Sequence, residues 1–146
     1  MSEFQNIILR YFYLGNFKYA PGTIASFFVL LFFFFIPNTF IYQSCILFSH
    51  ILIGFYFCYL FSIKKNKDKD PSFIVIDEVV GMMISLYLVP KYFSAYLLAF
   101  ILFRFFDIFK PSIIYRVQNL GYGIGIMMDD IVSGTLSLLI VTGIFY

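Results

Sequence analysis

The chain has 146 residues, of which 62% are hydrophobic and only 12% are charged. A soluble domain is about 45–50% apolar and about 25% charged, so this sequence lacks the polar side chains that a water-facing surface needs. This composition excludes a soluble monomer and a disordered chain, and a net charge of +2 gives no sign of a nucleic-acid partner. We expect a single membrane-embedded domain covering residues 1–146.

The predicted elements begin with an N-terminal amphipathic helix, because Phe4, Ile7, Ile8, Tyr11 and Phe12 follow helical spacing. Five apolar segments then predict hydrophobic helices at residues 24–36, 40–63, 79–89, 92–103 and 131–146. A membrane-spanning helix needs about 20 apolar residues, and only 40–63 reaches that length unaided. The others either recruit polar flanks or are short, partly buried or re-entrant. The predicted fold is therefore all-α, an integral membrane bundle of about five hydrophobic helices, several of them short.

If these segments alternate in direction across the membrane, the charged residues are distributed very unevenly between its two sides. Only Lys91 falls on one side. The cations of the other side are Arg10, Lys18, Lys64, Lys65, Lys67, Lys69, Arg104, Lys110 and Arg116. The positive-inside rule makes that second side cytoplasmic. All eight acids fall there too, which the rule does not require: Glu3, Asp68, Asp70, Asp77, Glu78, Asp107, Asp129 and Asp130.

Two polar motifs open apolar segments in the first half of the chain. Ala20-Pro21-Gly22-Thr23 is either a plain helix start or an anion site built from free backbone N–H groups. Asp77-Glu78 precedes the third segment, where a helix dipole accounts for one acid better than for two. Carboxylates gathered near a membrane face are ligands that Mg²⁺ prefers.

Two further motifs lie in the second half. Arg104, Asp107 and Lys110 are spaced to share one broad helix face, as a ladder of ion pairs or as a phosphate clamp with a metal ligand. Alternating glycines at 121, 123 and 125 predict a tight loop that approaches a ligand, and Asp129-Asp130 follows. Two acidic pairs on one face, with Asp107 between them, favour a metal site over ordinary helix starts.

Taken together, the four motifs from Ala20 to Gly134 resemble the bacterial phosphatidylglycerophosphatase A family. The resemblance implies an Mg²⁺-dependent enzyme of the inner membrane that removes the terminal phosphate of phosphatidylglycerophosphate to give phosphatidylglycerol. The sequence departs from the family at Ala25-Ser26, Ser112-Ile113 and Ser133-Gly134. These changes are mild and remove no candidate ligand.

The residues predicted to carry this chemistry fall into two groups. Asp77, Glu78, Asp107, Asp129 and Asp130 are expected to bind one or two Mg²⁺ ions, and with Lys110 they form the predicted catalytic set. Thr23, Arg104 and Lys110 are expected to bind the phosphate of the lipid substrate. We expect a multi-pass protein of the bacterial inner membrane whose active site faces the cytoplasm.

Two other functions are compatible with part of this pattern. A small non-enzymatic transporter would place its acids near the bilayer midplane, whereas here they lie at segment ends. Another lipid-headgroup phosphatase, or a phosphatidyltransferase, is the second alternative, although the transferase signature is missing. The number of metal ions, the general base and the oligomeric state stay open.

Overall fold

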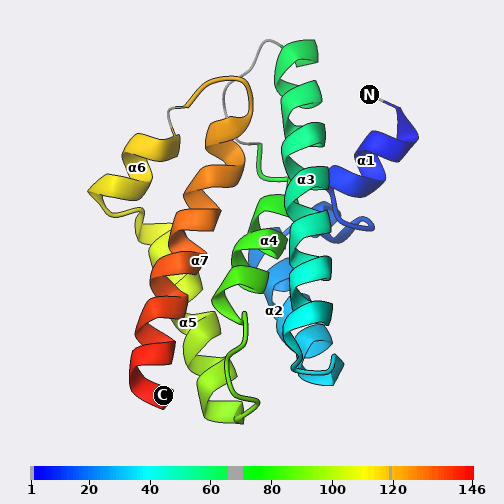
Figure 1. Cartoon of the computed structure of the whole chain (residues 1–146). Coiled ribbons are helices and arrows are strands. Elements are labelled where there is room, and N and C mark those ends of the chain that lie inside the picture. Colours follow the sequence, from blue (N-terminus) through cyan, green and yellow to red (C-terminus); the bar gives the residue numbers. More distant parts are fainter. Residues whose placement is uncertain (1, 66–70, 119) are drawn as a thin grey trace.

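The computed structural model describes residues 2–65, 71–118 and 120–146, which form helices and no strand (Figure 1). This confirms the all-α prediction. The elements are α1 (Glu3–Leu9), the 3-10 turn η1 (Leu14–Asn16), α2 (Pro21–Phe35), α3 (Phe40–Lys65), α4 (Ile76–Ser85), α5 (Phe93–Phe109), α6 (Ser112–Gln118) and α7 (Ile124–Phe145). The predicted cytoplasmic charges at Lys67, Asp68, Lys69 and Asp70 lie outside the described residues.

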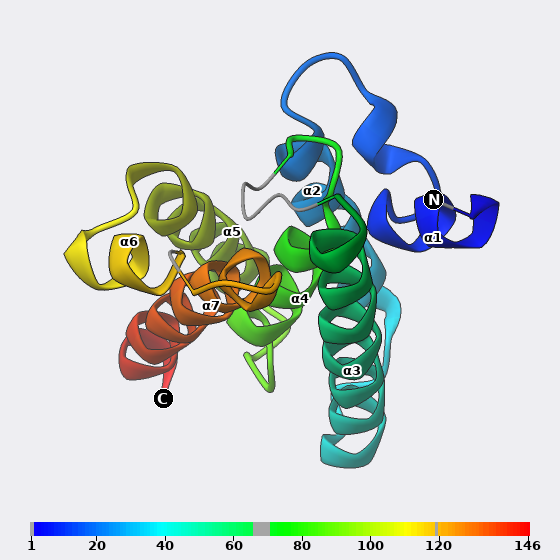
Figure 2. The same ribbon diagram turned by 90° about the horizontal axis from the view of Figure 1, so that it is seen from above.

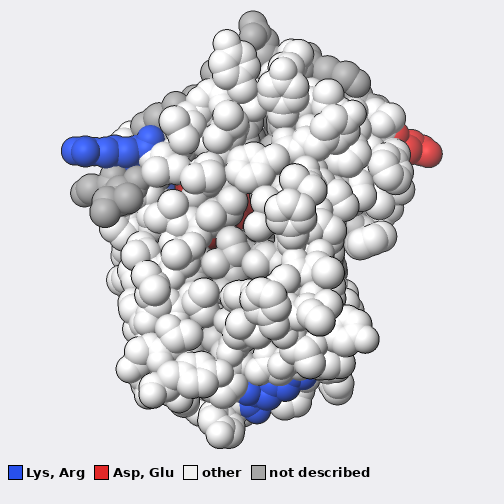
Figure 3. All heavy atoms as spheres, viewed as in Figure 1, with Lys and Arg blue, Asp and Glu red and all other residues white. Residues whose placement is uncertain are grey.

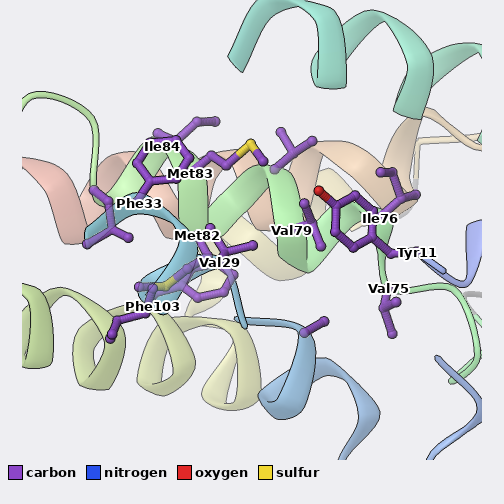
Figure 4. Packing of buried hydrophobic residues seen from close by; sticks show 14 of the residues in the cluster. Tyr11, Val29, Phe33, Val75, Ile76, Val79, Met82, Met83, Ile84 and Phe103 are labelled. Atoms are coloured by element: carbon purple, nitrogen blue, oxygen red, sulfur yellow. The ribbon is translucent and has the colours of Figure 1, made fainter. Parts of the chain in front are cut away.

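Helix α4 lies at the centre of the bundle, with α2, α3, α5 and α7 around it (Figure 2). Every residue of α4 except Glu78 is buried. A helix that is apolar on nearly all sides is stable only when neighbours cover it, which explains this central position. Val29 of α2 and Phe103 of α5 pack beside Met82 of α4 (Figure 4).

Small residues bring α4 and α7 into backbone contact. A Cβ atom placed on Gly134 of α7 would lie 2.2 Å from the carbonyl oxygen of Gly81 of α4. Farther along the same pair of helices, the hydroxyls of Ser85 and Ser137 lie 2.6 Å apart, and both reach the carbonyl oxygen of Ala99 on α5. Close approach and buried hydrogen bonds are the means by which helices associate where hydrophobicity cannot drive them together.

The helix boundaries differ from the predicted segments in one important place. Helix α7 starts at Ile124 rather than at residue 131, so Asp129 and Asp130 lie in its second turn instead of opening it. As a result, two helices are long and apolar enough to cross a membrane: Phe40–Ile63 of α3 (24 residues) and Ile124–Phe145 (22 residues). Only the first had been expected to reach that length unaided, and the five-helix membrane bundle stays a prediction.

The outer surface is largely apolar. Phe35, Ile41 and Phe93 are among many large hydrophobic side chains with exposed fractions of 71–82%. Figure 3 shows one face on which charged atoms are few and widely separated. Contiguous apolar surface of this extent marks contact with a membrane or a partner.

The N-terminal helix is shorter than its apolar pattern predicts. A capping box formed by Ser2 and Gln5 starts the helix, which ends at Leu9. Leu9 is buried, and its carbonyl oxygen accepts a hydrogen bond from the backbone N–H of Val75 (2.9 Å). The N-terminal segment is thereby tied to the chain that leads into α4.

The two ends of the bundle carry different connections. The α2–α3 and α4–α5 loops and the C-terminus lie together at one end, while the chain enters α4 toward the other (Figure 1). Lys91 belongs to the α4–α5 loop, and Asp77 and Glu78 belong to the first turn of α4. The structure therefore separates Lys91 from these acids, as the alternating arrangement predicts.

Candidate active site

Helix α4 presents two acids in its first turn. Asp77 is buried and Glu78 is half-buried. Both carboxylates face the positive end of the helix dipole, which favours negative charge there. A Cβ atom on Gly22 would lie 1.9 Å from Oε1 of Glu78, so the start of α2 closes directly against this carboxylate.

The glycine motif before α7 makes close contacts within the protein itself. Gly123 has a φ of +75°, and a Cβ atom there would lie 2.4 Å from the carbonyl oxygen of Cys58. A Cβ atom on Gly125 would lie 2.2 Å from the carbonyl oxygen of Gln118. These glycines seat α7 on the rest of the chain, which differs from the ligand-approaching loop expected from the sequence.

Helix α7 carries its acid pair into the bundle next to α4. Asp77, Glu78 and Asp130 each offer a carboxylate oxygen, and these three oxygens lie within 4.8 Å of one another. We call this group the acidic triad. Asp130 is 3% exposed, and its Oδ1 atom has no hydrogen-bond partner among the described residues.

The acidic triad fits a divalent cation. Buried carboxylates that lie so close together repel each other and cost free energy unless a positive charge compensates them. Hard oxygen donors are the ligands of Mg²⁺, which also keeps several waters. Glu78 of the triad is only half-buried, and Figure 3 shows acidic atoms at the bottom of a recess on this face of the molecule.

Two cation–carboxylate pairs belong to the same four-motif set. Arg104 and Asp107, near the end of α5, form an ion pair of 2.5 Å. The Nζ atom of Lys110 donates a hydrogen bond of 2.6 Å to Oδ2 of Asp129. Lys110 ends α5 in a left-handed conformation (φ 41°), and this contact links the end of α5 to α7.

The charge state of Lys110 follows from these surroundings. Burial alone lowers the pKa of its ammonium group. The hydrogen bond from Lys110 to Asp129, and the negative charges of Asp129, Asp130 and Asp107, outweigh burial and raise that pKa above its ordinary value. Lys110 is therefore a fixed positive charge at neutral pH.

The predicted carboxylates thus fall into separate groups. Asp77, Glu78 and Asp130 form the acidic triad, whereas the structure pairs Asp129 with Lys110 and Asp107 with Arg104. Asp107 also lies close enough to act electrostatically on Asp130. The expected metal role of Asp107 and Asp129 stays a prediction.

The predicted phosphate-binding residues lie on α2 and at the C-terminal end of α5. Thr23 is half-buried in the first turn of α2, directly after Gly22. The Nε atom of Arg104 is buried and has no hydrogen-bond partner within the described part of the chain. It is a donor with the geometry to bind an anion.

Sequence reasoning missed the part that Gly22 plays. The glycine after Pro21 looks like an ordinary helix start, and its contact with Glu78 is visible only once α2 and α4 are packed. The one available signal was a residue without a side chain inside a motif already suspected of binding an anion.

Comparison with known proteins decides the family. The family model described as phosphatidylglycerophosphatase A matches residues 7–145. The chain belongs to the phosphatidylglycerophosphatase A family. It is therefore a phosphatase, and the alternative of a non-enzymatic carrier is set aside.

Curated relatives agree with this membership. The chain is 35% identical over 132 residues to the phosphatidylglycerophosphatase A of Escherichia coli, covering 87% of this chain and 73% of the relative. It is 40% identical over 100 residues to that of Haemophilus influenzae, covering 65% and 59%. It is also 32% identical over 137 residues to a Bacteroides thetaiotaomicron protein named "Putative phosphatidylinositol-3-phosphatase", covering 87% and 84%. No solved structure matches the chain.

Proposed function

We propose that this enzyme hydrolyses the terminal phosphate of phosphatidylglycerophosphate, releasing phosphatidylglycerol and inorganic phosphate, with Mg²⁺ held by its carboxylates. The observation that carries the proposal is the acidic triad, which lies with the Lys110–Asp129 and Arg104–Asp107 pairs in one region of the bundle. Carboxylates for a metal, together with cations for a phosphate, are the parts that phosphoryl-group hydrolysis needs.

In this proposal Asp77, Glu78 and Asp130 hold the metal ion, and Asp107 and Asp129 add ligands directly or through water. A metal ion held there would supply charge neutralisation for the phosphate oxygens and a lower pKa for a bound water. The protein contributes a buried cage in which α4 and α7 fix the carboxylates relative to one another through the Gly81–Gly134 contact.

Arg104, Lys110 and Thr23 bind the phosphate in the proposed complex. The guanidinium of Arg104 offers two parallel N–H donors, and Lys110 supplies a point charge. Helix α2 has no side-chain cap, and the amide groups of a first helical turn have no partner within the helix. Thr23 and these amides can therefore donate to phosphate oxygens.

The reaction itself is a displacement at phosphorus. A water oxygen forms a bond to phosphorus as the bond between phosphorus and the glycerol oxygen breaks. A carboxylate of the site accepts the proton of the water, and the departing glycerol oxygen takes up a proton from this carboxyl group or from solvent water to become the hydroxyl of phosphatidylglycerol. Arg104 and Lys110 stabilise the negative charge that spreads over the phosphoryl oxygens.

We place this site at the cytoplasmic face of a bacterial inner membrane, in a multi-pass arrangement. The support is the charge asymmetry along the chain and the position of Lys91 away from the acids. Replacing Cys45 and Cys58 by Ser and adding either Lys91→Cys or Arg116→Cys gives one thiol per variant. A membrane-impermeant maleimide applied to spheroplasts should label position 91 and not position 116, and the reverse pattern would overturn the orientation.

A second substrate has specific support. The Bacteroides relative, whose alignment covers most of both chains, carries a name for a phosphatase of a phosphoinositide. Phosphatidylinositol 3-phosphate also bears a phosphate monoester on a lipid headgroup, and the same residues could bind it.

Phosphate release from the purified protein in detergent separates these possibilities. Both lipids are offered with Mg²⁺, with EDTA, and with Mg²⁺ restored after EDTA. We expect faster release from phosphatidylglycerophosphate, loss in EDTA and recovery with Mg²⁺. A preference for the phosphoinositide would make that lipid the substrate instead. Full activity in EDTA would overturn the proposed dependence on Mg²⁺.

A further inference from the structure

An apolar cavity lies between α2 and α5, outside the site described above. Its volume is about 110 Å³. The walls include Phe27, Leu30 and Phe34 from α2 and Tyr96, Leu97 and Phe100 from α5. Tyr96 directs its hydroxyl to the carbonyl oxygen of Phe33, so the polar atom of this side chain is occupied within the protein.

Aromatic pairs join the two helices at two levels of this cavity. The rings of Phe27 and Phe100 meet edge to face at 6.1 Å, and those of Phe34 and Tyr96 at 5.8 Å. Such pairs fix the spacing of the two helices on either side of the cavity. Leu97 is 41% exposed at its rim, which leaves the cavity open to the surroundings.

The cavity stands in a definite relation to the proposed phosphate site. Thr23 lies in the first turn of α2, and Phe27 follows it by about 6 Å along the helix axis and Phe34 by about 17 Å. On α5, which runs toward the site, Phe100 precedes Arg104 by about 6 Å. The same two helices thus carry phosphate-binding candidates at one end and an apolar wall farther along.

These depths match half of a bilayer. One leaflet of the hydrocarbon core is about 15 Å thick. A lipid whose headgroup phosphate is held between Thr23 and Arg104 would therefore bring its acyl chains alongside the cavity.

We propose that this cavity binds a segment of an acyl chain of the substrate lipid while the headgroup phosphate occupies the site, an inference that rests on the proposed function. Binding energy from the chain then positions the distant phosphate, so a substrate with short chains is hydrolysed less efficiently. The cavity is an acyl-chain subsite of the enzyme.

The test compares phosphatidylglycerophosphate with long and with very short acyl chains, both in detergent micelles. The measured quantity is the ratio of kcat/KM for the long-chain substrate to that for the short-chain substrate. Leu97→Trp fills the cavity from its rim, and Leu97→Phe does so more mildly if the tryptophan variant does not fold. Leu52→Trp is the matched control, because Leu52 is 55% exposed on α3 and does not line the cavity.

We expect the wild-type ratio to be well above one and to fall about tenfold in Leu97→Trp, with little change in Leu52→Trp. A wild-type ratio near one would overturn the subsite, and so would an equal effect of the cavity and control variants. If neither lipid is hydrolysed at all, the proposed function fails first, and this outcome is distinguishable from the others.

Discussion

The two ends of the helical bundle use their polar side chains differently. At the end that holds the α4–α5 loop, Lys91 donates to the carbonyl oxygens of Phe34 (2.8 Å) and Ile36, at the C-terminal end of α2. Gln43 accepts a hydrogen bond from the backbone N–H of Leu88 (2.7 Å) and donates one to Asn38. The polar side chains at this end form hydrogen bonds with other groups of the protein and join its loops.

Around the acidic triad, some buried polar atoms lack hydrogen-bond partners among the described residues. Asp130 keeps a buried oxygen without a hydrogen-bond partner among the described residues, and Arg104 keeps a buried Nε atom in the same condition. Leaving such groups unsatisfied is costly, so their presence indicates partners beyond the described residues. Both ends carry charged side chains, so the contrast lies in the unsatisfied polar atoms of Asp130 and Arg104 and not in charge as such.

The largest effect is expected for Asp130→Asn. The amide keeps the size of the side chain and removes a negative charge from the acidic triad. We expect activity to fall by roughly a hundredfold to a thousandfold. Thermal unfolding in detergent, followed in parallel, should show no loss of stability because carboxylate repulsion is relieved. Activity within a few-fold of wild type would remove Asp130 from the site.

A lysine at each end allows a direct contrast. Lys110→Met should lower activity about a hundredfold, because it removes the charge proposed to bind phosphate and leaves Asp129 buried without its cation. Lys91→Met should leave activity unchanged and cost about 1 kcal/mol of stability through loss of the α2 C-terminal contacts. Equal activity of the two variants would contradict the assignment of a catalytic lysine to one end and a structural lysine to the other.

A smaller effect is expected from Gly22→Ala. The added methyl group meets Glu78 and must displace its carboxylate, so we expect roughly a tenfold loss of activity and a weaker response to added Mg²⁺. Gly143→Ala is the matched control, since a Cβ atom there meets nothing within 4 Å. If both variants keep wild-type activity, the position of Glu78 is not critical.

The smallest change in activity is expected for Ser137→Ala. This variant removes a buried hydroxyl that contacts Ser85 and Ala99 midway along the bundle. Stability should fall by about 1 kcal/mol with activity retained, as measured by thermal unfolding and phosphate release. A large loss of activity would show that the α4–α5–α7 contact acts on the site.

Much of this arrangement follows from the sequence because it depends on local pattern. Apolar runs predicted the hydrophobic helices. The acids at 77, 78, 107, 129 and 130 were predicted as metal ligands from their places at the ends of these runs, and three of them form the acidic triad. The start of α7 was misplaced because Ile126, Met127 and Met128 join the helix across a glycine motif that resembles a loop. Gly123 is the left-handed N-cap of α7, and packing of Gly125 against backbone carbonyls outweighs its low helix propensity.

The sequence could not predict which partner each of the five carboxylates contacts. Sequence spacing made Asp129 and Asp130 equivalent, yet adjacent residues on a helix point about 100° apart. One therefore faces Lys110 and the other faces the first turn of α4. Such a distinction depends on the rotation of α7 about its axis, which only tertiary packing fixes.

The contact between Gly81 and Gly134 has a consequence for ion selectivity. Because backbone meets backbone there, the separation of α4 and α7 is set by atoms that cannot change rotamer, one turn away from Asp130. Mg²⁺ needs oxygen ligands at about 2.0–2.1 Å, whereas Ca²⁺ accepts about 2.3–2.6 Å and a looser shell. In the proposed metal site, a pair of glycines that holds the two helices at minimum spacing would therefore favour the smaller ion, and we expect a methyl group at either position to shift the metal preference toward the larger ion.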